Sequence, residues 1–436
     1  MLQAISRPAV SLADRYLPDA FVFVLVLTIV AAASAIAFEG AGPLEVVEMW
    51  GDGFWGLLAF SMQMLLVLVT GFILASSPPV RRILGALAGL ARSAGAAIVL
   101  VTLVSMVAAW INWGFGLVVG ALFAKEVARH VRVDYRLLVA SAYSGFVVWH
   151  AGLAGSVPLT IATPGHFAEG QIGLVGTDAT IFAPFNLIIV AVLFVTIPLL
   201  NRLMLPREDE SVYVSREQLG EKQAEDFAPA RPADHLENSR ILMWLVGVPG
   251  LVFLVHYFAV RGEGLNLNIV NYLFLMLGIV LHGTARNLLA ALQEGVKGGA
   301  GIVIQFPFYA GIMAIMTQSG LAASMSHFFV SISSAATLPF WTFLSAGLVN
   351  LFVPSGGGQW AVQAPVVLPA AEALGADVAR VAMAVAWGDA WTNLLQPFWA
   401  LPMLGIAGLK AKDIMGFCLV HLVVVGAVVG TLLTVL

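Results

Sequence analysis

The sequence of 436 residues has few charged residues and a single cysteine. Only 11% of the residues are Asp, Glu, Lys or Arg, against about 25% in soluble domains. One cysteine, Cys418, excludes a disulfide framework within the chain and a cluster of thiolate metal ligands. The net charge of −4 offers no basic surface for a nucleic acid. With 60% hydrophobic residues, the composition predicts an all-α polytopic membrane protein in a lipid bilayer.

Charge is also missing from a stretch that is too long for one membrane span. Residues 93–124 contain no charged side chain. As a single helix they would extend about 48 Å, whereas the hydrocarbon core is about 30 Å thick. Asn112-Trp113-Gly114-Phe115-Gly116 stands in the middle, and basic residues flank both ends. The pattern predicts a re-entrant helical hairpin, residues 93–124, that enters from the cytoplasmic side with its tip at residues 112–116.

A second uncharged stretch covers residues 298–371 and contains Pro354-Ser355-Gly356-Gly357-Gly358. A continuous helix is not expected there, because proline lacks a backbone donor and glycine loses the most backbone entropy. Non-helical backbone at membrane depth survives only where protein covers it or where it lines a wet cavity. We therefore expect a second re-entrant hairpin, residues 339–371, entering from the outside with a binding site at its tip. The alternative is a glycine-rich packing contact between helices.

The other hydrophobic segments predict nine membrane spans, of which the spans near residues 137–163 and 382–404 are broken by glycine or polar residues. Basic residues mark the cytoplasmic loops, so the N-terminus is expected in the cytoplasm and the C-terminus in the periplasm. The loop from Glu39 to Asp52 has four acids and no base, which places it outside. A loop with Arg286 and Lys297 is expected inside.

The two halves of the chain are related by an inverted repeat. A shift of 242 positions (356 − 114) aligns Gly114 and Gly116 with Gly356 and Gly358. Residues 1–205 would form the first repeat, with four spans and hairpin 93–124, and residues 206–240 a cytoplasmic linker. Residues 241–436 would form the second repeat, with five spans and hairpin 339–371. Inverted repeats with broken helices are typical of secondary transporters that bind near the middle of the membrane.

Both hairpin tips offer backbone N–H groups to a ligand. Asn112 and Ser355 are suited to cap the second arms, so two helix N-termini, each with about half a positive charge, would meet in the membrane. Such a site suits a small carboxylate without a fixed cation. The residues predicted to bind the substrate are Asn112, Trp113, Gly114, Gly116, Ser156, Ser355, Gly356, Gly357, Gly358, Gln359 and Asn393.

Few ionisable side chains lie inside the predicted spans. Asp389 is the only formally charged residue between Val381 and Leu409, and an intramembrane carboxylate usually binds a proton or a cation. His150 can carry a proton near neutral pH. Asp389, His150 and Thr392 are predicted to bind a coupling ion, H⁺ or Na⁺, with H⁺ favoured; no other cofactor and no structural metal is expected. The alternatives are an aspartate hydrogen-bonded to a helix end and an interior histidine with satisfied hydrogen bonds.

Several segments closely resemble the bacterial short-chain fatty acid transporter family. They are WGDGFWGLLAFSMQM (50–64), INWGFGLVVGALFAKEVAR (111–129), GSVPLTIATPGH (155–166), IQFPFYAGIM (304–313), VPSGGGQWAVQAP (353–365) and QPFWALPMLGIAGL (396–409). The resemblance covers nearly the whole chain except the linker. It implies an inner-membrane carrier for small monocarboxylates such as acetoacetate or butyrate. Through the ion transporter superfamily, it also implies a scaffold and a transport domain, often in a homodimer that works as an elevator.

Other functions remain open at this point. A carrier or exchanger for dicarboxylates or other organic anions of the same superfamily is the main alternative, although no Arg or Lys near the tips could hold a second carboxylate. A passive channel is disfavoured by the paired hairpins. An enzyme is not expected, because the sequence contains no HExxH motif, no GxSG-type nucleophile motif and no paired aspartates on facing spans.

Overall fold

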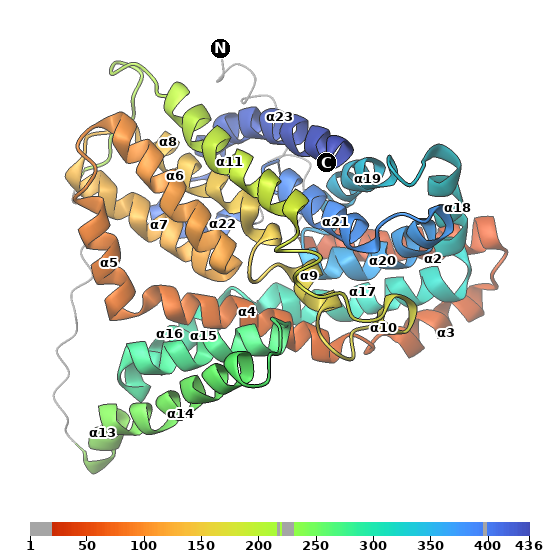
Figure 1. Ribbon diagram of the computed structural model, residues 1–436, viewed down its shortest axis with the longest axis horizontal. Helices are drawn as coiled ribbons and strands as arrows, with labels where there is room; N and C mark the ends of the chain where they lie inside the picture. The colour runs from red at the N-terminus through yellow and green to blue at the C-terminus, as the bar shows by residue number, and fades with distance from the viewer. Residues whose placement is uncertain (1–19, 216–218, 220–230, 396–398) are drawn as a thin grey trace.

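The computed structural model describes residues 20–215, 219, 231–395 and 399–436, which form helices and loops without a strand (Figure 1). Eight stretches of these residues are long and apolar enough to cross a membrane. They are Phe21–Glu39, Leu58–Ser76, Ala94–Ile111, Tyr135–Ile161, Pro184–Leu203, Pro232–Ala259, Ala300–Gln318 and Ala411–Val435. The prediction of an all-α polytopic membrane protein is confirmed.

The first hairpin consists of α6 (Ala94–Ile111) and α7 (Trp113–His130), with only Asn112 between them. Asn112 has an extended backbone, and its Oδ1 accepts the N–H of Phe115 at 2.9 Å, so it is the predicted N-cap. Its Nδ2 donates to the carbonyl of Val67 on α4 (Leu58–Ser76) at 3.4 Å. The break is shorter than predicted, because Gly114 and Gly116 belong to the first turn of α7.

The second hairpin consists of α19 (Leu338–Asn350) and α20 (Gly356–Leu374), joined by residues 351–355. Ser355 caps α20, and its Oγ accepts the N–H of Gly358 at 3.4 Å. Gln359 Nε2 donates to the carbonyl of Ala346 at 2.8 Å and thereby ties the two arms together. In Figure 1 the hairpins occupy opposite halves of the molecule, and their tips meet near its middle.

Two interrupted helices run beside the hairpins, as predicted. The first comprises α8 (Tyr135–Ser144), the 3-10 helix η1 (Gly145–Ala151) and α9 (Ser156–Ile161). The second comprises α21 (Val378–Thr392) and α22 (Ala400–Ala407). η1 packs on α6 and α21 packs on α19, so each interrupted helix lies along the first arm of one hairpin.

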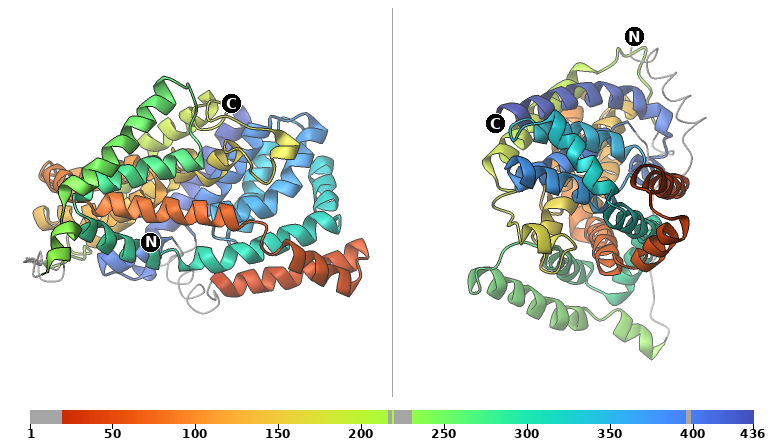
Figure 2. Two further views of the ribbon diagram at one scale, coloured as in Figure 1. Left: turned by 90° about the horizontal axis from the view of Figure 1, so that it is seen from below. Right: turned by 90° about the vertical axis from the view of Figure 1, so that its right-hand side faces the viewer.

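The remaining long helices surround this centre. α4 packs on α7, and α17 (Ala300–Gln318) packs on α20. α11 (Pro184–Leu203) packs on α6, α23 (Ala411–Val435) packs on α19, and α11 and α23 contact each other. α2 (Ala20–Glu39) and α14 (Arg240–Ala259) expose most of their apolar side chains, as helices in contact with lipid do. Figure 2 shows α14 at the edge of the molecule, next to α15 (Leu267–His282).

Several segments expected as loops are helical. The acidic loop contains α3 (Pro43–Gly53), where Glu45 Oε2 accepts the N–H of Gly42 at 3.1 Å. The loop with Arg286 and Lys297 is α16 (Ala285–Lys297), whose charged residues lie on one side of an amphipathic helix. The other short helices are α5 (Pro78–Ala88), α10 (Glu169–Ile172), α13 (Pro232–Glu237) and α18 (Leu321–Ile332). Part of the predicted linker lies outside the described residues, and the division into repeats remains a prediction.

Candidate substrate site between the hairpin tips

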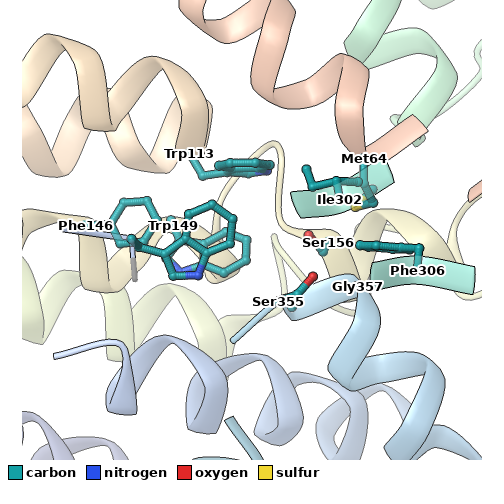
Figure 3. A pocket seen from close by; sticks show the side chains of 11 residues that line it. Met64, Trp113, Phe146, Trp149, Ser156, Ile302, Phe306, Ser355 and Gly357 are labelled. Carbon is teal, nitrogen blue, oxygen red and sulfur yellow. The ribbon is translucent and has the colours of Figure 1, made fainter. Parts of the chain in front are cut away.

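A pocket lies where the two hairpin tips meet the first interrupted helix (Figure 3). Its empty space is about 280 Å³, including the part open to solvent. The first hairpin contributes one residue, Trp113. The wall is mostly apolar. The lining residues are Met64, Trp113, Phe146, Trp149, Ser156, Ile302, Phe306, Ser355, Gly356, Gly357 and Trp399.

The polar end of the pocket is formed by Ser156 and Ser355. Figure 3 shows both hydroxyl groups facing the pocket, one from the first residue of α9 and one from the N-cap of α20. Ser355 Oγ accepts the N–H of Gly358, and within the described part of the chain the N–H groups of Gly356 and Gly357 have no acceptor. The 19-residue helix α20 therefore presents free donors and its positive end to the pocket.

The three consecutive glycines allow this helix end to approach its neighbours closely. A Cβ atom on Gly356 would lie 2.6 Å from Cε1 of His150, and one on Gly357 would lie 2.9 Å from Cζ of Phe60. On Gly358 it would lie 2.5 Å from the ring of Tyr309. A larger residue at any of these three positions would have to displace the neighbouring side chain or the start of α20.

Behind the polar end, His150 connects the pocket to a buried carboxylate. Nδ1 of His150 lies 3.0 Å from Oδ2 of Asp389, and both side chains are fully buried. Nε2 accepts the N–H of Val157 at 3.1 Å. Because Nε2 accepts, the ring proton is assigned to Nδ1, which donates to Asp389. His150 also stacks on Trp149 at 4.0 Å.

A second polar cluster surrounds Asn350 at the C-terminal ends of α19 and α21. Its Nδ2 lies 2.9 Å from the carbonyl oxygen of Asp389, 2.9 Å from Oγ1 of Thr392 and 3.1 Å from Oδ1 of Asn393. The hydroxyl of Tyr143 donates to the carbonyl of Asn393 at 2.7 Å. Thr392 and Asn393 thus belong to this oxygen-rich cluster and do not line the pocket.

Only some of the predicted substrate residues line the pocket: Trp113, Ser156, Ser355, Gly356 and Gly357. The other six do not. Gly114 and Gly116 were expected as ligand-binding glycines, but a Cβ atom would lie 2.9 Å from the Leu68 carbonyl oxygen and 2.4 Å from Cα of Ala109, respectively. They are packing glycines in this structure. Asn112 and Gln359 hold the hairpins, Gly358 packs on Tyr309, and Asn393 lies in the second cluster.

The sequence analysis missed the apolar wall and the role of two amides. Met64, Ile302 and Phe306 come from α4 and α17, which carry no break or motif that separates them from ordinary membrane helices. Asn350 stood only at the edge of the predicted break. Asn186 was not noticed, although its Oδ1 accepts from Trp387 Nε1 at 3.0 Å and its Nδ2 donates to the Ala151 carbonyl at 3.2 Å. The sequence signal that could have identified both asparagines is a polar residue on an otherwise apolar helix.

Comparison with known proteins places these features in context. A family model described as "Short chain fatty acid transporter" matches residues 1–436. A protein of Escherichia coli (strain K12) is 44% identical, over 98% of this chain and 98% of its own length. A protein of Haemophilus influenzae is 42% identical, over 97% of both chains. Both bear the provisional name of short-chain fatty acid transporter.

A solved structure shares the fold. The Alcanivorax borkumensis YdaH transporter, described as having an unusual topology, superposes with a TM-score of 0.63 over 96% of this chain and 98% of its own. The two chains are 17% identical, so the similarity concerns the arrangement of helices and not the ligand.

Proposed function

Because the chain belongs to the short-chain fatty acid transporter family, we propose that it carries small monocarboxylates, such as acetoacetate or butyrate, across the bacterial cytoplasmic membrane. The family membership makes the protein a multi-pass membrane transporter and not an enzyme. The observation that carries the finer proposal is the small pocket that joins Ser156, Ser355 and the free N–H groups of α20 under an apolar wall.

The carboxylate binds at the polar end of the pocket. Its oxygens accept from the N–H groups of Gly356 and Gly357 and from the hydroxyls of Ser156 and Ser355. The positive end of α20 stabilises the negative charge, by about 0.3–1 kcal/mol at an exposed site and more where water is excluded. The alkyl part lies against the apolar wall. Since no Lys or Arg lines the pocket, a monoanion is favoured over a dicarboxylate.

The His150–Asp389 pair supplies the coupling proton. The Nδ1–H of a neutral His150 donates to Asp389, and in this proposal an unprotonated carboxylate gives the pair one negative charge. One added proton neutralises the pair, which removes a repulsive charge close to the arriving anion. Tyr143 on α8 interacts electrostatically with Asp389 and also with Cys418 on α23. Na⁺ bound by the oxygens around Asn350 is the alternative coupling ion.

Transport follows an elevator motion in this proposal. Met64 on α4 and Ile302 and Phe306 on α17 form one side of the pocket, and the hairpins and interrupted helices form the other. Sliding of the second group along α4 and α17 would carry the bound acid and separate it from these three side chains. The homodimer, the cytoplasmic N-terminus and the periplasmic C-terminus belong to the same proposal.

Uptake into proteoliposomes tests this function. Labelled butyrate or acetoacetate should accumulate when the outside is acidic, and an imposed Na⁺ gradient alone should have little effect. Accumulation driven by Na⁺ alone would show that the coupling ion is Na⁺ and not H⁺. No accumulation under either gradient would refute ion-coupled transport of these acids. Competition by unlabelled succinate or citrate, if as strong as that by butyrate, would favour the dicarboxylate carrier.

A further inference from the structure

The apolar wall of the pocket contains a hydrogen-bond donor that the carboxylate end does not use. Nε1 of Trp113 has no hydrogen-bond partner among the described residues, and the side chain is only 3% exposed. Buried donors without an acceptor are uncommon and call for an explanation. Trp113 lines the pocket, so a bound molecule is the available acceptor.

The Trp113 ring is held in a defined orientation. Trp113 is the first residue of α7, directly after the Asn112 cap. Its ring packs edge to face with Trp149, at a centroid distance of 6.0 Å, and with Trp399, at 5.1 Å. Figure 3 shows its nitrogen edge turned toward the side of the pocket where Met64 and Ile302 lie. A donor that is oriented before binding loses little entropy on binding.

Trp149 also lines the pocket and its Nε1 also has no partner among the described residues, but its ring is oriented differently. A Cβ atom on Gly356 would lie 2.7 Å from Cη2 of Trp149, so the carbon end of this indole faces the second tip. Trp113 lies on the other tip, away from the proposed carboxylate end, and is therefore assigned to the chain of the acid. A plain alkyl chain would leave its N–H buried and unpaired, which weakens binding relative to a chain with an acceptor.

We propose that the Trp113 N–H binds a second oxygen on the substrate, such as a 3-oxo or 3-hydroxy group. The preferred substrates are then oxygenated short-chain monocarboxylates, and unsubstituted acids of the same length bind more weakly. This inference rests on the proposed function, because it assigns the chain of the acid to the wall once the carboxylate occupies the polar end.

The test is competition with labelled butyrate in proteoliposomes, using unlabelled 3-oxobutanoate, 3-hydroxybutanoate and butyrate. The wild-type protein should bind the two oxygenated acids more tightly than butyrate. In Trp113→Phe this preference, measured as the ratio of the affinities for 3-oxobutanoate and butyrate, should fall by about tenfold. Trp360→Phe is the matched control, because Trp360 Nε1 also has no partner among the described residues but Trp360 does not line the pocket. The control should keep the wild-type preference.

The outcomes separate this inference from the proposed function. Equal affinity of the wild-type protein for butyrate and 3-oxobutanoate would overturn the inference without any variant. A preference that is unchanged in Trp113→Phe, or lost equally in Trp360→Phe, would overturn it as well. Transport of butyrate in those cases would leave the proposed function standing, whereas no binding of any of the three acids would remove both.

Discussion

The first hairpin turns at one residue, Asn112, whereas the second turns over residues 351–355. Gly114 and Gly116 of the first hairpin face backbone atoms of Leu68 and Ala109. Gly356 and Gly358, their counterparts after a shift of 242 positions (356 − 114), face the rings of His150 and Tyr309. Glycines at equivalent positions therefore act differently in the two hairpins.

The difference shows how two similar helical hairpins can contribute unequally to one pocket. Contacts with backbone hold the first turn of α7 against α4 and against α6, the other arm of the same hairpin. The glycines in the first turn of α20 instead contact side chains. This turn lies beside Ser156 in the pocket and next to His150, which pairs with Asp389. From the first hairpin, only the side chain of Trp113 reaches the pocket. Four predictions, made on five variants, test this contrast.

The largest expected effect is that of Gly357→Leu in the second hairpin. The new side chain would collide with Phe60, 2.9 Å from the Cβ position, and with Met64 at 3.2 Å. It would also displace the N–H groups that are proposed to bind the acid. We expect a loss of uptake of at least about 100-fold with the protein still folded, because both neighbours are ends of side chains. Uptake and size-exclusion profile are measured together. The control is Gly85→Ala on α5, because no atom lies within 4 Å of the added Cβ atom. Normal uptake by Gly357→Leu would contradict the assigned site.

Asp389→Asn should uncouple transport from the proton gradient. The amide cannot take up the proton that neutralises the His150–Asp389 pair, so accumulation driven by an acidic outside should fall about 100-fold. Exchange of labelled for unlabelled acid without a gradient should persist, since the polar end of the pocket is intact. Proton-driven accumulation at the wild-type level would show that this carboxylate does not carry the coupling proton.

Gly116→Ala in the first hairpin should act on stability. The added methyl group would lie 2.4 Å from Cα of Ala109, and backbone cannot move aside as a side chain can. We expect a destabilisation of about 2 kcal/mol, visible as a lower melting temperature, with a KM for the acid close to the wild-type value in the protein that folds. A raised KM at unchanged stability would place this glycine in the substrate site after all.

The smallest effects come from the two caps, Asn112→Ala and Ser355→Ala. Each removes a cap of about 1 kcal/mol, so both variants should melt at slightly lower temperature. Of the two variants, only Ser355→Ala should also raise the KM for the acid, by about fivefold, because Ser355 lines the pocket and Asn112 does not. Equal KM values for the two variants would remove the contrast between the tips.

Much of the fold was accessible from the sequence. The uncharged stretches, their glycine and proline breaks and the basic loops predicted the hairpins and the interrupted helices, because a bilayer limits the length of a helix and requires a hydrogen bond for each backbone group. The same reasoning pointed to Ser355, Gly356 and Gly357, which line the pocket, and their role in binding remains a prediction. It failed for α3 and α16, since charged residues on one face of an amphipathic helix resemble a loop when only charge is counted.

The amino-acid sequence by itself determined that the protein spans a membrane, where its helices break and which caps start the second arms, because these depend on local chemistry. Only the tertiary structure decided which donors face the pocket. Gly114 and Gly356 look alike in sequence, and the atoms across from them belong to helices far away in the chain. The pairing of His150 with Asp389, 239 positions later, likewise depends on the packing of two interrupted helices. Long-range packing decides such contacts, and no local pattern encodes it.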